Sequence, residues 1–207
     1  MITIVDYKAG NLTSVQLALE SIGEDVLITR NPDEILAATR VVFPGVGAAR
    51  SAMANLDELG LTDALKQVVA KGVPFLGICI GMQLLFRFSE ENGGTDCLGL
   101  VEGKVKLFKP SDPMCKIPQM GWNTVKLVKS HPVFEGIENE SEFYFVHSYY
   151  PSPLDDGSVV GQTEYADAVF ASAVAKGNLI ATQFHPERSG RIGLKLLENF
   201  CRWEPTC

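Results

Sequence analysis

The stretch VPFLGICIGMQLLF, residues 73–86, decides the fold. Its first half is a short apolar run that ends at Cys79, and its second half, IGMQLLF, is apolar on nearly all sides. A strand that turns sharply into a helix buried against a sheet is typical of the βα units of parallel sheets. We therefore expect a strand that ends at Cys79 and a buried helix directly after it.

The residues before this stretch alternate between strand-like and helix-like patterns. Three runs are predicted strands: ITIV (2–5), VLIT (26–29) and RVVF (40–43). Apolar residues recur at helical spacing between the first two strands: Leu12, Val15, Leu19 and Ile22. Asn31 and Pro32 are predicted to start a further helix. This alternation predicts a doubly wound, mostly parallel central sheet with flanking helices.

The pattern changes from about Val101, where apolar and polar residues alternate. Five segments there are predicted strands: VEGKVKLF, NTVKLV, EFYFVHSYY, SVVGQTEY and LIATQF. Only RIGLKLLENFCRW, residues 191–203, returns to a helical pattern. We expect this β-rich second half to pack against the central sheet, so that residues 1–207 form a single α/β domain.

The composition is that of a globular protein and argues against nucleic-acid or membrane binding. The chain is 46% hydrophobic and 21% charged, and no apolar run approaches the ~18 residues of a membrane-spanning helix. Its net charge of −7 repels phosphate backbones and anionic membranes. The N-terminal residues lack the features of a secretory signal, so we expect a soluble, cytoplasmic protein.

The cysteines predict neither disulfides nor a metal site. There are five: Cys79, Cys97, Cys115, Cys201 and Cys207. Their number is odd, they are widely spread and no two form a CxxC pair, so reduced thiols are expected. We expect no metal and no cofactor.

Cys79 lies in GICIG, residues 77–81, which matches a nucleophile elbow with cysteine in place of serine. The flanking glycines leave room for a tight turn that lifts the central side chain above the sheet. At the start of a helix, the dipole and the free N–H groups favour a thiolate. The alternative is that Cys79 is a small buried hydrophobic residue, and GICIG alone does not separate the two interpretations.

His185 and Glu187 form a candidate base with its orienting carboxylate. His185 closes an apolar strand in QFHPERSG, and Pro186 favours an extended backbone there. Extended residues two apart point the same way, so Glu187 can reach one ring nitrogen and leave the other for the thiol. By itself HPE could equally be an exposed loop. His131 has no acid two positions on and is expected to be structural, whereas His147 could line a pocket or satisfy a core hydrogen bond.

The PGVG loop, residues 44–47, is a candidate oxyanion site. It follows a predicted strand, and its glycines let backbone N–H groups approach a developing oxyanion. The expected donors are the amides of Val46 and Gly47 together with that of Ile80, directly after the nucleophile. The alternative is a phosphate-binding loop, which usually has a third glycine or a downstream lysine.

Taken together, PGVG, GICIGMQLL, YFVHSYY and FHPERSG resemble the class I glutamine amidotransferases, whose Cys-His-Glu triads hydrolyse glutamine to glutamate and ammonia. More narrowly, DYKAGN, PQMGWN and YFVHSYY resemble the glutaminase subunits of imidazole glycerol phosphate synthases, which act in histidine biosynthesis. Related amidotransferases usually have histidine where this chain has Met82. The resemblance runs from the first strand to the last helix.

The resemblance implies a partner and further site residues. Such glutaminases bind a separate (βα)8-barrel cyclase as a heterodimer and pass ammonia to it, and that cyclase produces imidazole glycerol phosphate and AICAR. Residues expected to hold L-glutamine are Gln83, His147, Ser148 and Tyr149. Residues expected toward the cyclase are Asn11, Gln119, Trp122 and Asn123. Three positions depart from the usual pattern: Lys8, Arg50 and Gln119.

Three other functions remain open at this point. The chain could be a class I glutaminase that supplies a different synthase, or a catalytically silent regulatory subunit, although all triad residues are present. It could also be a cysteine peptidase or thioesterase with a related elbow. Release of ammonia from free glutamine distinguishes an amidotransferase from the last class.

Overall fold

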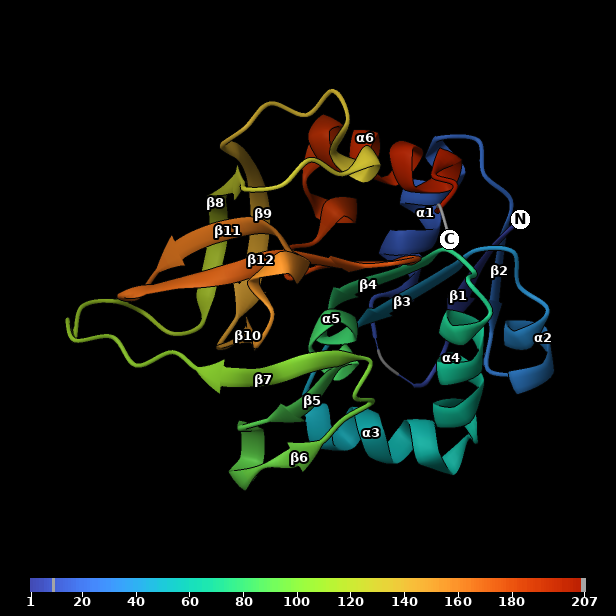
Figure 1. Cartoon of the computed structure of the whole chain (residues 1–207), viewed down its shortest axis with the longest axis horizontal. Coiled ribbons are helices and arrows are strands. Elements are labelled where there is room, and N and C mark those ends of the chain that lie inside the picture. Colours follow the sequence, from blue (N-terminus) through green and yellow to red (C-terminus); the bar gives the residue numbers. More distant parts are fainter. Residues whose placement is uncertain (9, 206–207) are drawn as a thin grey trace.

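The computed structural model describes residues 1–8 and 10–205, so Ala9 of the DYKAGN motif and Cys207 lie outside the described residues. A mixed sheet of nine strands runs through the molecule in the order β2-β1-β3-β4-β13-β12-β11-β8-β9 (Figure 1). Its parallel part consists of β1 (Ile2–Val5), β2 (Val26–Thr29), β3 (Val41–Gly45), β4 (Phe75–Cys79) and β13 (Leu179–Thr182). Its antiparallel part consists of β12 (Ala168–Lys176), β11 (Val159–Tyr165), β8 (Gln119–Leu127) and β9 (Ser141–His147).

Helices cover both faces of the parallel part (Figure 1). They are α1 (Leu12–Ser21), α2 (Pro32–Leu36), α3 (Ala49–Glu58), α4 (Leu61–Ala70), α5 (Ile80–Leu85) and α6 (Gly190–Arg202). Figure 1 shows α1 and α6 on one side of the strands and α3, α4 and α5 on the other. Every residue of β1, β3, β4 and β13 is buried, as apolar strands enclosed from two sides must be. Within the described residues, no helix is long and apolar enough to span a bilayer.

A second sheet of four strands lies beside α3 and α5 (Figure 1). Its order is β10-β7-β5-β6, with β10 (Tyr149–Pro153), β7 (Val101–Leu107), β5 (Phe86–Ser89) and β6 (Thr95–Asp96). Four short 3-10 turns complete the described elements: η1 (Glu91–Gly93), η2 (Pro132–Phe134), η3 (Asp156–Ser158) and η4 (Pro186–Arg188).

The predicted α/β class, with a parallel centre and a β-rich second half, is confirmed, but the arrangement of that second half differs from the prediction. Its strands were expected to pack against the central sheet, whereas most of them continue it. The segment LIATQF contributes β13, which lies beside β4 in the parallel part. On its other edge β13 pairs with β12, so its backbone N–H and C=O groups are satisfied inside one sheet.

The helix after Cys79 is also shorter than predicted. It is buried along its whole length, as expected, but it ends at Leu85. Phe86 has the extended dihedrals φ −70° and ψ 171° and opens β5, which pairs in parallel with β7. The apolar pattern of this segment therefore spans a helix and the start of a strand.

The parallel strands bring three loops to one edge of the sheet. Gly45 at the end of β3 is in register with Cys79 at the end of β4, and Ile78 is in register with Thr182 at the end of β13. The PGVG loop, Cys79 and the HPE segment therefore leave the sheet side by side. The carboxyl edge of a parallel sheet is where α/β proteins usually bind ligands.

Candidate active site

Cys79 occupies a sharp turn between β4 and α5. Its φ of 55° and ψ of −110° are strained for a residue with a side chain, a feature that is common at functional sites. Gly81 makes the turn possible, because a Cβ atom there would lie 1.8 Å from the carbonyl oxygen of Phe43. At Gly77 a Cβ atom would lie 2.9 Å from a methyl group of Leu85. Both glycines of the predicted elbow thus have a steric role.

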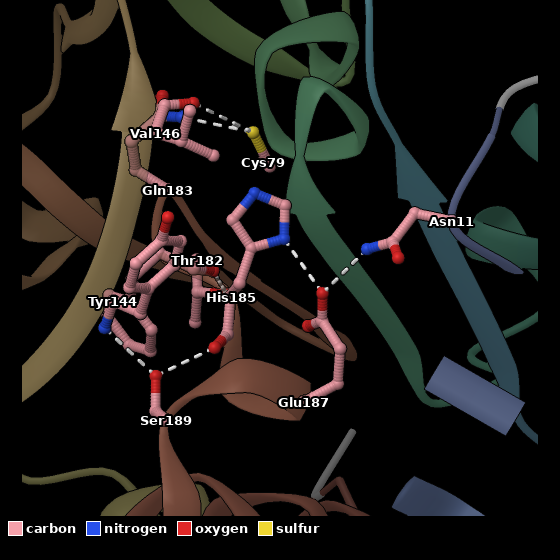
Figure 2. A network of polar contacts seen from close by, with 10 residues as sticks. Asn11, Cys79, Tyr144, Val146, Thr182, Gln183, His185, Glu187 and Ser189 are labelled. Carbon is pink, nitrogen blue, oxygen red and sulfur yellow. Dashed lines mark hydrogen bonds and ion pairs between the residues drawn. The ribbon is translucent and has the colours of Figure 1, made fainter. Parts of the chain in front are cut away.

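The thiol of Cys79 is only 4% exposed and lies among polar groups. Its Sγ is 3.9 Å from the carbonyl oxygen of Val146, and the Gln183 amide donates to it over 3.7 Å. These contacts direct the side chain toward Val146 and Gln183, as Figure 2 shows.

His185 and Glu187 are paired as predicted from their spacing. Nδ1 of His185 lies 2.8 Å from Oε1 of Glu187, and both side chains are almost completely buried. Asn11 donates from Nδ2 to the same carboxylate oxygen over 3.0 Å. Figure 2 shows the other ring nitrogen of His185 directed toward Cys79. That Nε2 atom is buried and has no hydrogen-bond partner among the described residues.

The electrostatics of His185 favour its charged form. Burial lowers the pKa of the imidazole, but the neighbouring Cys79 thiolate and the Glu187 carboxylate more than offset this and raise the pKa from 6.5 to about 10. The imidazolium form of His185 is therefore favoured beside the sulfur of Cys79 at neutral pH.

A buried serine fixes the backbone of His185. The hydroxyl of Ser189 donates to the carbonyl oxygen of His185 over 2.7 Å and accepts from the amide of Tyr144 over 3.0 Å. The amide of His185 in turn donates to the carbonyl oxygen of Tyr144 over 2.9 Å. Figure 2 shows this link between β9 and the segment after β13. The imidazole is thus attached to the sheet on one side and oriented by Glu187 on the other.

A cavity of about 330 Å³ opens beside these side chains. Its walls come from the PGVG loop, the elbow, β9 and the start of β10. They comprise Val46, Gly47, Cys79, Ile80, Gln83, Glu91, Pro118, Val146, His147, Ser148, Tyr149 and His185. All three predicted oxyanion residues and all four predicted glutamine-binding residues are therefore in its lining.

Gln83 and Tyr149 form one wall of the cavity. Nε2 of Gln83 donates to the carbonyl oxygen of Tyr149 over 3.0 Å and to the side chain of Gln183 over 2.9 Å. Oε1 of Gln83 is buried and has no partner among the described residues. Gln83 thus braces the cavity wall at Tyr149 and leaves one buried acceptor without a partner among the described residues.

His147 lines the same cavity but has both ring nitrogens engaged. Nδ1 lies 2.8 Å from the carbonyl oxygen of Tyr149, and Nε2 lies 2.9 Å from Oε1 of Gln119. Burial lowers its pKa to about 4, the Tyr149 carbonyl opposes that shift and nearby His185 adds to it. His147 is therefore a neutral, fixed part of the wall.

His131 lies outside this site. Its Nδ1 accepts from the amide of Val133 over 3.2 Å, and its ring packs 4.8 Å from that of Trp203. A larger, more open cavity of about 640 Å³ adjoins it, but the lining of that cavity includes none of the predicted triad. Burial and nearby Lys129 lower the pKa of His131 to about 4.

The four residues predicted to face a partner differ in exposure. The indole of Trp122 is 55% exposed, and Met120 beside it is 67% exposed. Asn123 is half-buried and donates to the carbonyl oxygen of Glu164. Gln119, by contrast, is only 3% exposed because its side chain turns inward to His147. The side chain of Asn11 points to Glu187.

Among the site residues that were not identified from the sequence are Glu91, Gln183 and Ser189. Gln183 and Ser189 flank the HPE motif closely, so their positions next to a candidate base were a usable signal. Glu91 has no such signal, because its place in the cavity depends on how η1 folds against α3.

Metal and disulfide chemistry find no support in the described part of the chain. No group of three His, Cys, Asp or Glu side chains there could hold a metal ion. Cys79, Cys97, Cys115 and Cys201 are free thiols. Burial raises the pKa of both Cys97 and Cys201 to about 12, which makes these two poor nucleophiles.

Comparison with known proteins identifies close relatives. Residues 3–203 match the family model for glutamine amidotransferase class-I. The chain is 52% identical over 200 residues to imidazole glycerol phosphate synthase subunit HisH of Methanocaldococcus jannaschii, covering 97% of this chain and 98% of that relative. It is 50% identical to the HisH subunits of Dehalococcoides mccartyi and Methylococcus capsulatus, covering 96% and 97% of those relatives and 97% and 99% of this chain.

Solved structures support the same fold at much lower sequence identity. A crystal structure described as glutamine amidotransferase has a TM-score of 0.75 at 19% identity and covers 98% of both chains. The structure of PurLQS from Thermotoga maritima has a TM-score of 0.72 at 16% identity and covers 97% of both chains.

Proposed function

Because the chain belongs to the class I glutamine amidotransferases, and within them to the HisH glutaminase subunits of imidazole glycerol phosphate synthase, we propose that Cys79, His185 and Glu187 are its catalytic triad. The observation that carries the proposal is the free Nε2 of His185, which is buried, faces Cys79 and belongs to a ring oriented by Glu187. The raised pKa of His185 supports an imidazolium that can donate its Nε2 proton beside Cys79.

The reaction that follows is hydrolysis of L-glutamine through a thioester. The Cys79 thiolate attacks the side-chain amide carbon, and His185 donates its Nε2 proton to the departing nitrogen, which leaves as ammonia. Neutral His185 then removes a proton from water as that water attacks the thioester. Glutamate leaves, and the thiolate and imidazolium are restored, so one water is consumed for each ammonia released.

The oxyanion formed in both steps needs donors close to Cys79. We assign this role to the backbone amides of Val46, Gly47 and Ile80, which line the cavity around the thiol. Gly47 has a φ of 96°, and no atom lies within 4 Å of a Cβ built there. Its glycine is therefore required for conformation rather than for space.

The amino-acid part of glutamine matches the polar wall of the cavity. The unpaired Oε1 of Gln83 can accept from an N–H group of the substrate. Glu91 supplies a carboxylate in the same lining, which suits the α-ammonium group. Ser148 and Tyr149 offer backbone groups beside them, and His147 holds that segment in place.

A subunit of a synthase requires a partner subunit. We propose that this partner is a (βα)8-barrel cyclase that forms a heterodimer with the chain and uses its ammonia to make imidazole glycerol phosphate and AICAR in the cytoplasm. Met120 and Trp122 are exposed at the start of β8, which supports a docking surface there. We assign Asn11 and Asn123 to the same docking surface. Residues 1–207 act as one domain in this assembly.

Alkylation with a glutamine analogue that carries a diazoketone tests the nucleophile. One label per chain is expected on Cys79, and Cys79→Ser should abolish labelling and lower glutamine hydrolysis by roughly 10³-fold or more. Ammonia release and peptide mass mapping provide the measurements, with the cyclase present. Cys115→Ser is the matched control and should keep full activity. A label on Cys97, Cys115 or Cys201 would move the nucleophile elsewhere and overturn the triad.

A further inference from the structure

Two side chains attach the η1 turn to the first turn of α3. The amide of Ala49 donates to Oε2 of Glu91 over 2.6 Å. Arg50 donates from Nη2 to the carbonyl oxygens of Asn92 over 2.7 Å and Gly94 over 3.1 Å. Figure 1 shows α3 beside the β5 and β6 end of the smaller sheet, where this turn lies.

These contacts lie at the end of the PGVG loop. Ala49 is only two residues beyond Gly47, so Glu91 holds an amide close to the proposed oxyanion donors. Glu91 also lines the cavity together with Val46 and Gly47. One carboxylate thus contacts the anchor of the loop and faces the ligand site.

The η1 turn has an unusual backbone that needs support. Asn92, Gly93 and Gly94 have successive φ values of 52°, 81° and 108°. The Arg50 guanidinium bonds the carbonyl oxygens of the first and last of these residues. A charged, planar group that bonds two carbonyls at once restricts the turn strongly.

We propose that Arg50 and Glu91 are positioning residues that hold the PGVG loop in register with bound glutamine. The inference rests on the proposed glutaminase reaction and deepens it. Arg50 fixes the turn that presents Glu91, and Oε2 of Glu91 fixes the loop through Ala49. Oε1 of Glu91 has no hydrogen bond to any described residue and would accept from the ammonium group of the substrate. Substrate binding and the oxyanion donors are thereby linked through one carboxylate.

The two residues should affect different kinetic constants. The hydrogen bonds of the Arg50 side chain among the described residues all go to the turn, so its loss should displace the oxyanion donors and, to a smaller extent, Glu91, which keeps its charge. A missing donor costs about 10²–10³ in kcat, and a displaced one should cost about tenfold. Loss of the Glu91 charge should also raise KM, but only for substrates that carry an α-ammonium group.

The experiment compares Arg50→Met and Glu91→Gln in the complex with the cyclase and its nucleotide ligand. Each variant is assayed with L-glutamine and with glutaramate, which has the same amide but no α-amino group. Arg50→Met should lower kcat about tenfold for both substrates and raise KM for glutamine less than Glu91→Gln does, because the Glu91 charge is retained. Glu91→Gln should raise KM for glutamine and lower kcat for both substrates. Arg50→Lys, which keeps one donor group, should recover part of kcat.

Arg87→Met is the control, because Arg87 is exposed on β5 and its side chain makes no hydrogen bond among the described residues. It should match the unsubstituted protein, and thermal melts should show all variants folded. An unchanged kcat in Arg50→Met, or a change confined to KM, would overturn the positioning role. A failure of the proposed function looks different, because the unsubstituted protein would then release no ammonia from glutamine in the complex.

Discussion

At the scale of single residues, the site depends on how one carboxylate oxygen is shared. Oε1 of Glu187 accepts from the ring of His185 and from Asn11, whereas its Oε2 has no partner among the described residues. Two donors on one oxygen hold the carboxylate in a single orientation, and this sets the direction of the imidazole. Since the pKa of His185 is raised above 6.5, its charged form stabilises the fold fully below that pH, and this contribution is lost as pH rises through about 10.

Substitution of the three histidines should separate the base from the structural rings. His185→Ala should lower glutamine hydrolysis by roughly 10³-fold or more, because its Nε2 faces the thiol whereas both ring nitrogens of His147 are engaged by Tyr149 and Gln119. Glu187→Gln should cost roughly ten- to a hundredfold less, because the carboxylate orients the ring and transfers no proton. Steady-state ammonia release measures both effects. His131→Ala is the control, and a larger loss there than in His185→Ala would contradict the assignment.

Short sequence motifs predicted the candidate triad, whereas residues whose place depends on contacts between distant segments were missed. Cys79, His185 and Glu187 lie in short segments whose geometry follows from turns and strand spacing alone. Glu91 was missed because its role depends on a turn, a helix and a loop that meet only in the folded chain. Gln119 was expected to face a partner, but it is buried, because the predicted strand says nothing about which neighbour covers its side chain.

At the scale of elements, the elbow is set by the close approach of α5 to β3. Gly77 and Gly81 flank the nucleophile symmetrically in sequence, yet their surroundings differ. A Cβ atom at Gly81 would meet the backbone carbonyl of Phe43 at 1.8 Å, whereas one at Gly77 would meet a leucine methyl group at 2.9 Å. The leucine side chain can move the methyl group by changing its rotamer, but a backbone carbonyl within a sheet cannot move in this way.

Gly81→Ala should therefore be far more damaging than Gly77→Ala. Separating α5 from β3 should cost at least about 3 kcal/mol, which lowers the melting temperature of a domain of this size by about 6–12 °C. Gly77→Ala should cost less, because Leu85 can change its rotamer. Thermal unfolding followed by circular dichroism measures both shifts. An equal or larger shift for Gly77→Ala would show that the elbow is held in some other way.

The η2 turn predicts a pH effect on stability that is separate from catalysis. His131 caps this turn through Val133 and packs on Trp203, and its pKa is lowered to about 4. A lowered pKa means that neutral His131 stabilises the fold above pH 6.5 and that this contribution is lost as pH falls toward 4. His131→Asn keeps a capping oxygen but does not titrate in this range.

Urea unfolding at pH 7 and pH 4.5 should show the difference. The unsubstituted protein should lose more free energy of unfolding between the two pH values than His131→Asn does. Some acid sensitivity should persist in the variant, because His147 has a similarly lowered pKa. An identical pH dependence in both proteins would mean that His131 does not titrate with folding.

The order of the strands in the sheet could not be predicted from the sequence pattern. AVFASAVAK forms β12, but its many small residues do not give a clear alternation, and the strand was not predicted. β13 is the last strand in the chain, yet it lies between β4 and β12. Hydrophobic periodicity reports which face of a strand is buried and carries no information about its neighbour in the sheet.

At the scale of the whole molecule, one edge of the sheet carries the candidate active site and leads to the proposed docking surface. It gathers the triad and the cavity from β3, β4, β9 and β13. The same region includes Gln119 against His147, and β8 continues from it to exposed Met120 and Trp122. A partner that binds these exposed side chains would therefore be only a few residues from the cavity wall. This continuity offers a route by which docking could change the state of the site.

The last prediction is that the isolated chain is a weak glutaminase and that a liganded cyclase activates it. The amides of Val46 and Gly47 have no hydrogen-bond partner among the described residues, so the peptide between them can turn over although Glu91 anchors the end of the loop through Ala49. A peptide whose carbonyl faces the cavity removes one oxyanion donor, which costs about 10²–10³ in rate. Glutamine turnover should therefore rise by about that factor from the chain alone to the chain with cyclase and its nucleotide ligand, with the unliganded complex between them. Arg87→Met should respond as the unsubstituted protein does, whereas Trp122→Ala should weaken the response. Equal turnover in all three states would exclude activation by the partner and leave the triad assignment intact.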